Sequence, residues 1–216
     1  MVKGIIFDLD GVLVSTDMFH FEAWKRLAGE IGIDNYDIED NVLQRGISRM
    51  DSLEVLLRKS EKTYTLEEKE RLADRKNQYY QELLSGSEAD ILLPGAMKTL
   101  NLLRRKKVKV AVGSSSKNAL QIISKTKIDA YIDGCVCGLD ITFSKPNPEV
   151  FLKAAAKIGV EPAKCLVIED AAAGIEAGKR AGMKTLAVGQ DYQNLGADYM
   201  ARDLDSVGKW DSILEE

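Results

Sequence analysis

The sequence predicts an α/β protein in which a Rossmann-like, doubly wound parallel sheet carries an inserted, all-helical cap domain. Three observations predict this class. From about residue 92, short apolar strand patterns alternate with helical patterns, which is typical of parallel sheets. Another strand pattern stands at residues 4–8, and the long stretch between them shows no strand pattern. We therefore expect a core domain of residues 1–15 and 90–216 and a helical cap domain of residues 16–89.

The first strand is predicted by the apolar, partly β-branched run of residues 4–7, and Gly11 marks the turn beyond its end. In the cap, one predicted helix repeats apolar residues on a single face. These residues are His20, Trp24, Leu27 and Ile31. Thr65 and Glu68 form a capping-box pattern that opens a second long helix, which we expect to end at residues 85–87.

The predicted elements of the core alternate in chain order. They are a strand at 108–112, a helix at 117–126, a strand at 131–136, a helix at 148–158, a strand at 165–168, a helix at 174–181 and a strand at 185–188. Since consecutive strands are separated by helices, they are expected to be parallel and covered on both faces.

Composition excludes several classes of function. A chain of 216 residues that is 45% hydrophobic can bury a core, and its net charge of −4 includes no basic run typical of nucleic-acid binding. We find no signal-peptide pattern and no apolar stretch near the roughly 18 residues of a membrane span, so we expect a cytoplasmic protein with no nucleic-acid or membrane partner. No apolar surface patch or coiled-coil register is evident, so we expect a monomer. We interpret Cys135, Cys137 and Cys165 as reduced core thiols. A single histidine, His20, excludes multi-histidine metal sites.

Polar residues follow several of the predicted strands. Asp8 and Asp10 come after the first, Ser114 after the second, Lys145 further along, and the pair Glu169-Asp170 after the strand at 165–168. The carboxyl ends of parallel strands meet at one edge of a sheet, where open α/β folds bind ligands. Alone, each residue is equally a helix cap or a solvated loop residue; together they favour a catalytic site.

The residue types suit phosphoryl transfer. Asp8 is the candidate nucleophile, and Asp10 the candidate general acid and base. Asp8, Asp10, Glu169 and Asp170 offer the oxygen ligands that Mg²⁺ prefers. Ser114 and Lys145 are expected to bind the phosphoryl group.

This order of motifs resembles the haloacid dehalogenase superfamily of phosphotransferases, and the inserted helices resemble its cap. The cap sequence is similar to the β-phosphoglucomutase family. That resemblance implies interconversion of β-glucose 1-phosphate and glucose 6-phosphate, with one Mg²⁺ ion and β-glucose 1,6-bisphosphate as intermediate and priming donor. It also implies that Thr16 and His20 steer Asp10, although a lone histidine on an apolar helix face is more often a packed core residue. Arg49 is expected to hold the phosphate that is not transferred.

The residues that the resemblance places at the substrate are Trp24, Arg45, Gly46, Ser48, Arg49, Ser52, Ser115, Ser116, Lys117 and Asn118. Arg45 stands where lysine is expected, which keeps the charge but changes its reach. Two alternatives stay open: a sugar-phosphate phosphatase of the same superfamily, and a non-catalytic phosphosugar-binding protein.

Overall fold

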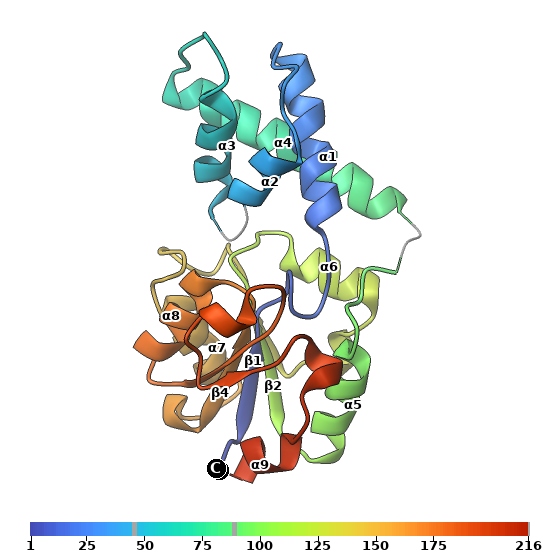
Figure 1. Ribbon diagram of the computed structural model, residues 1–216, viewed down its shortest axis with the longest axis vertical. Helices are drawn as coiled ribbons and strands as arrows, with labels where there is room; N and C mark the ends of the chain where they lie inside the picture. Colours follow the sequence, from blue (N-terminus) through green and yellow to red (C-terminus); the bar gives the residue numbers. More distant parts are fainter. Residues whose placement is uncertain (45–46, 88–89, 216) are drawn as a thin grey trace. The chain divides into compact units, whose positions relative to one another are not determined.

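The computed structural model describes residues 1–44, 47–87 and 90–215. The chain divides into two compact units, one formed by Met1–Ser15 with Asp90–Glu216 and the other by Thr16–Ala89. Figure 1 shows the sheet in the first unit and helices alone in the second.

The first unit is built on a parallel six-stranded sheet with the order β3-β2-β1-β4-β5-β6. The strands are β1 (Gly4–Phe7), β2 (Lys109–Gly113), β3 (Gly134–Val136), β4 (Cys165–Glu169), β5 (Lys184–Ala187) and β6 (Tyr199–Met200). β1 lies between β2 and β4, and Ile6 is paired with Ala111 and Val167. The chain reverses its direction of winding here, so the carboxyl end of β1 is where a ligand crevice is expected.

Helices cover both faces of this sheet, which confirms the predicted fold class. They are α5 (Ala96–Arg105), α6 (Ala119–Thr126), α7 (Glu149–Lys157), α8 (Ala172–Arg180) and α9 (Trp210–Glu215), with short 3₁₀ turns at Asp129–Tyr131, Pro162–Lys164, Tyr192–Asn194 and Leu204–Ser206. α7 and α8 lie on one side of the strands and α5 on the other (Figure 1). Phe151 of α7 and Ala177 of α8 pack on Ile6, Ala111 and Val167 in one apolar cluster.

Two core predictions are wrong in part. The strand predicted at 131–136 is limited to β3, because Tyr131 and Ile132 donate backbone hydrogen bonds to residues 128 and 129 and close a local turn. All three cysteines are free thiols, but Cys135 is only half-buried, since it lies on β3 at the edge of the sheet.

The second unit consists of α1 (Asp17–Glu30), α2 (Ile38–Leu43), α3 (Arg49–Leu57) and α4 (Leu66–Gly86). The predicted capping box at the start of α4 is confirmed: Thr65 Oγ1 accepts from the Glu68 N–H, and Glu68 accepts from the Thr65 N–H at 2.7 Å. Trp24 and Leu27 of α1 pack with Leu53 of α3 and Ala73 of α4 in the apolar core of this unit. In the described part of the chain, no helix is long and apolar enough to span a membrane.

Candidate active site

The turn after β1 places the first two predicted catalytic residues at the carboxyl edge of the sheet. Asp8 is buried and its N–H donates to the Ile168 carbonyl of β4 at 2.9 Å. Gly11 has a φ of +84°, and its N–H closes the turn on Val14. A Cβ at Gly11 would overlap the Asp170 carboxylate, so glycine is required both by the backbone and by the space.

Lys145 connects the two strand ends electrostatically. Its ammonium contacts Asp8 Oδ1 and lies 2.7 Å from Glu169 Oε1, while its side chain is 7% exposed. The three side chains come from β1, β4 and the loop before α7, and so from segments far apart in the sequence. Lysine side chains are seldom buried unless they are paired with acidic groups. Lys145 is buried and paired with two carboxylates, so it is not a solvated loop lysine.

Glu169 uses both of its carboxylate oxygens in this arrangement. Oε1 accepts from Lys145, and Oε2 accepts from the N–H groups of Asp170 and Ala171, both at 2.9 Å. Glu169 therefore binds Lys145 and also orders the two residues that lead into α8. Among the residues that the structure describes, no side chain caps the first turn of α8, so Glu169 is not the helix cap that the sequence left open. A Cβ at Gly174 would overlap the Glu169 carboxylate, so this carboxylate is closely enclosed.

Burial changes the acidity of two carboxyl groups in this cluster. It raises the pKa of Asp8 to about 7, against the lowering effect of Lys145 and with a further increase from Glu169. It likewise raises the pKa of Asp170 to about 8, assisted by the charges of Glu169 and Asp8. Two acids that resist ionisation side by side are stabilised as anions when a cation lies between them.

These groups fit a magnesium ion. Asp8 and Asp170 would supply carboxylate oxygens, and the Asp10 main-chain carbonyl belongs to the turn that follows Asp8. Within the described ranges, no three or more His, Cys, Asp or Glu side chains form a metal-binding group. A cation here therefore needs main-chain and water oxygens in addition to carboxylates, which is usual for Mg²⁺. Direct ligation by Glu169 stays a prediction, because its oxygens are engaged elsewhere.

The raised pKa values give a testable pH dependence. Without divalent cations, we expect the free energy of unfolding to fall as the pH rises from about 5.5 to 8.5, because the folded chain holds protons on Asp8 and Asp170 that the unfolded chain has released. Magnesium should suppress this fall. Urea unfolding at several pH values, with and without MgCl₂, measures it, and Asp170→Asn should flatten the slope. A stability that rises across this range in the metal-free protein would contradict the assignment.

Ser114 lies at the end of β2 as predicted and is buried. Its N–H donates to the Val136 carbonyl, and its hydroxyl accepts from the Ser116 N–H at 3.1 Å. The Ser116 hydroxyl accepts in turn from the Asn118 N–H, so the two hydroxyls order the loop that leads into α6. Asn118 is buried, whereas Lys117 is exposed and Ser115 is half-buried. Roles in phosphate or sugar binding stay predictions for these residues.

Three of the predicted cap residues, Ser48, Arg49 and Ser52, lie at or near the start of α3. Ser48 is the N-cap, its Oγ accepting from the Asp51 N–H, and Ser52 Oγ donates to the Ser48 carbonyl at 2.9 Å. Arg49 is half-buried, donates to Asn77 Oδ1 at 2.9 Å and lies 3.7 Å from Asp74. Arg45 and Gly46, also predicted at the substrate, lie outside the described residues.

One candidate functional residue was missed from the sequence. Lys76 of α4 is 3% exposed, and its Nζ lies 2.6 Å from Nδ1 of His20. Burial, the Lys76 charge and the Arg49 charge lower the pKa of His20 well below its usual value. The available signal was helical spacing, because Lys76 lies three residues before Tyr79 and four before Tyr80 on the buried face of α4.

Thr16 is buried at the N-cap of α1, and Trp24 is 2% exposed.

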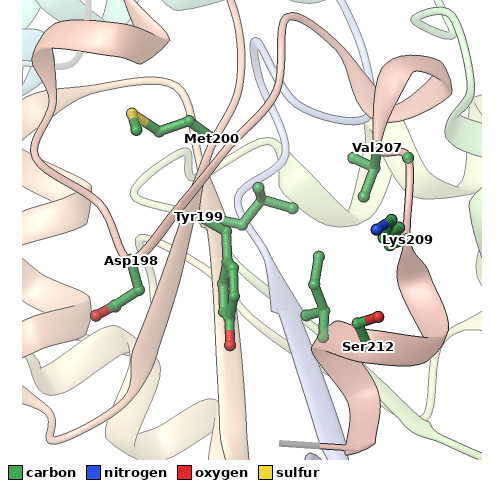
Figure 2. Close-up of a pocket in the computed structure, with 9 residues that line it drawn as sticks. Asp198, Tyr199, Met200, Val207, Lys209 and Ser212 are labelled. Carbon is green, nitrogen blue, oxygen red and sulfur yellow. The ribbon is translucent and has the colours of Figure 1, made fainter.

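A separate hollow of about 390 Å³ lies beside β6, the strand at one edge of the sheet (Figure 2). Asp198, Tyr199 and Met200 line it from one side, and Lys209 and Ser212 from the other. None of the predicted site residues lines this hollow.

The chain is similar to several known proteins. Residues 2–182 match the model of the haloacid dehalogenase-like hydrolase family. A β-phosphoglucomutase from Bacillus subtilis is 43% identical over 203 residues, covering 93% of this chain and 89% of its own. A phosphorylated carbohydrates phosphatase from Thermotoga maritima is 30% identical and covers 86% of this chain and 84% of its own. The crystal structure of a β-phosphoglucomutase from Clostridium difficile has a TM-score of 0.89 and 36% identity, covering 100% of this chain and 96% of that one.

The chain belongs to the haloacid dehalogenase-like hydrolase family. It is an enzyme of this family and is similar, over nearly its whole length, to β-phosphoglucomutases. The predicted superfamily and fold class are confirmed.

Proposed function

We propose that the chain is a β-phosphoglucomutase that interconverts β-glucose 1-phosphate and glucose 6-phosphate through β-glucose 1,6-bisphosphate. The observation that carries the proposal is the buried cluster in which Lys145 lies between Asp8 and Glu169, with Asp170 adjacent. Such a cluster suits a carboxylate that accepts a phosphoryl group. The 43% identity to a β-phosphoglucomutase favours a sugar hydroxyl over water as the second acceptor.

In the proposed reaction, an Asp8 oxygen attacks the phosphorus of the bisphosphate. The bond from phosphorus to the sugar oxygen breaks, and Asp10 gives its proton to that oxygen. The aspartyl-phosphate later returns its phosphoryl group to a sugar hydroxyl, whose proton passes to Asp10. Lys145 neutralises charge on the phosphoryl oxygens, and Ser114 donates a hydrogen bond to them. A magnesium ion held by Asp8, the Asp10 carbonyl and Asp170 would supply positive charge that lets one anion attack another.

The helical unit is proposed to be a cap that selects substrates carrying a second phosphate. Arg49 is the candidate group, because a guanidinium can bind phosphate through two parallel hydrogen bonds. Thr16 and His20 are proposed to steer Asp10. The protein is proposed to act in the cytoplasm as a monomer.

Phosphorus NMR of the products tests this function. With Mg²⁺, pure β-glucose 1-phosphate and a trace of β-glucose 1,6-bisphosphate, we expect glucose 6-phosphate with little inorganic phosphate. Dominant release of inorganic phosphate would replace the mutase by a sugar-phosphate phosphatase, the activity named for the Thermotoga maritima relative. Absence of any turnover would favour a phosphosugar-binding protein.

Arg49→Ala should affect binding of the second phosphate and not transfer of the phosphoryl group to Asp8. We expect mutase kcat/KM to fall about 100-fold, the loss of a charge-assisted hydrogen-bonded pair. Phosphorylation of Asp8 by acetyl phosphate, which carries no second phosphate, should change less than about threefold. Arg58→Ala, at an exposed position at the end of α3, is the matched control and should leave both rates unchanged. Equal losses in both assays would contradict the role of Arg49.

A further inference from the structure

The second unit contains a buried ammonium group that faces two aromatic rings. Lys76 Nζ lies 4.7 Å from the ring centroid of Trp24 and 5.3 Å from that of Tyr80. The faces of aromatic rings attract cations, and the attraction is strongest where water is excluded. Lys76, Trp24 and Tyr80 are all at most 3% exposed. The rings therefore stabilise the charge of Lys76 and restrict where its ammonium can lie.

The same ammonium fixes the state of His20. An ammonium group has hydrogen-bond donors and no acceptor, so at 2.6 Å it donates to Nδ1 of His20. A neutral imidazole that accepts at Nδ1 carries its proton on Nε2. The His20 ring also stacks on Tyr80, with centroids 4.3 Å apart and an angle of 27° between the planes. The charged groups that face His20 are Lys76 from α4 and Arg49 from α3, and both oppose its protonation.

Tyr79, the residue before Tyr80, makes different contacts. Tyr79 is equally buried, but its ring contacts the guanidinium groups of Arg26 and Arg75, and its hydroxyl contacts Glu30. Of the two adjacent tyrosines, Tyr80 is therefore the one whose ring contacts both Lys76 and His20.

We propose that Trp24 and Tyr80 are positioning residues that hold the Lys76 ammonium against Nδ1 of His20 and thereby keep the His20 proton on Nε2. This inference rests on the proposed function, in which His20 steers Asp10 and needs a fixed donor to do so. Trp24 then acts through its ring face inside the helical unit.

Imidazole ¹⁵N NMR tests the proposal without any turnover. His20 is the only histidine, so the untagged full-length chain labelled with [¹⁵N]histidine gives unambiguous ring signals. We expect the wild type and Tyr80→Phe to show the neutral Nε2–H tautomer from about pH 6 to 8. Tyr80→Leu and Trp24→Leu should show mixed tautomers and protonation near pH 6. Tyr79→Leu, the matched loss of a neighbouring ring, should keep the wild-type signals.

Kinetics then show whether Tyr80 acts through Lys76. Tyr80→Leu and Lys76→Met should each lower kcat about tenfold with KM nearly unchanged, and the double variant should be no slower than Lys76→Met alone. Tyr80→Phe should restore kcat, since it keeps the ring face. Losses that multiply to about 100-fold would mean independent structural effects and would overturn the proposal.

The positioning role of Trp24 and Tyr80 and the proposed function can fail separately. If Tyr80→Leu and Trp24→Leu keep the single wild-type tautomer, or if Tyr79→Leu disturbs it equally, the positioning role is wrong whatever the activity. If the tautomer responds as expected but β-glucose 1-phosphate yields no glucose 6-phosphate, the proposed function fails and the positioning of His20 stands.

Discussion

Asp8→Asn is expected to reduce turnover of β-glucose 1-phosphate by at least about 10⁴-fold, because an amide cannot accept the phosphoryl group. The same substitution should not destabilise the fold. Burial raises the pKa of Asp8 to about 7, so the ionised carboxylate is costly in the folded chain and a neutral amide of the same shape avoids that cost. At about pH 8 and without magnesium, we expect Asp8→Asn to unfold at the same urea concentration as the wild type or a higher one.

Steady-state kinetics and urea unfolding on the same preparations measure the two effects. Asp191→Asn, at an exposed position after β5, is the matched control and should leave both unchanged. Unchanged turnover in Asp8→Asn would show that Asp8 is not the nucleophile and that this cluster is not the catalytic site. A large drop in stability would mean instead that the lost activity reflects unfolding.

Lys145→Met should cause the largest loss of stability at this site. Removing the cation leaves the buried carboxylates of Asp8 and Glu169 without their shared partner, and breaking a buried ion pair in this way costs about 3–5 kcal/mol. The cost should be greatest at about pH 8 and smaller at about pH 5.5, where Asp8, with its pKa raised further by the loss of the ammonium, is protonated and uncharged.

Urea unfolding at the two pH values checks this expectation. Lys153→Met is the control: its ammonium pairs with Glu149 at 2.6 Å, but the lysine side chain is 47% exposed, so its loss should cost less than about 1 kcal/mol. Equal costs for the two lysines, or a cost for Lys145→Met that does not depend on pH, would show that burial of the cluster is unimportant.

Local sequence determined most of the fold. The strand at residues 4–7, the buried strand that begins at Cys165 and the capping box of Thr65 and Glu68 were all predicted, because burial pattern, β-branching and cap chemistry act within a few residues. The strand predicted at 131–136 was wrong in its first half, since apolar residues in a local turn resemble those of a short strand.

The sequence by itself also determined which carboxylates and serine stand at strand ends and which lysine stands in the loop before α7, and through them the family. Only the tertiary structure decided how these groups are paired: that Lys145 lies between Asp8 and Glu169, and that Lys76 lies against His20, 56 residues away. Strand ends can be predicted because the apolar periodicity of a strand involves only consecutive residues. The partner of a buried charge is set by the packing of distant segments, which no local pattern records.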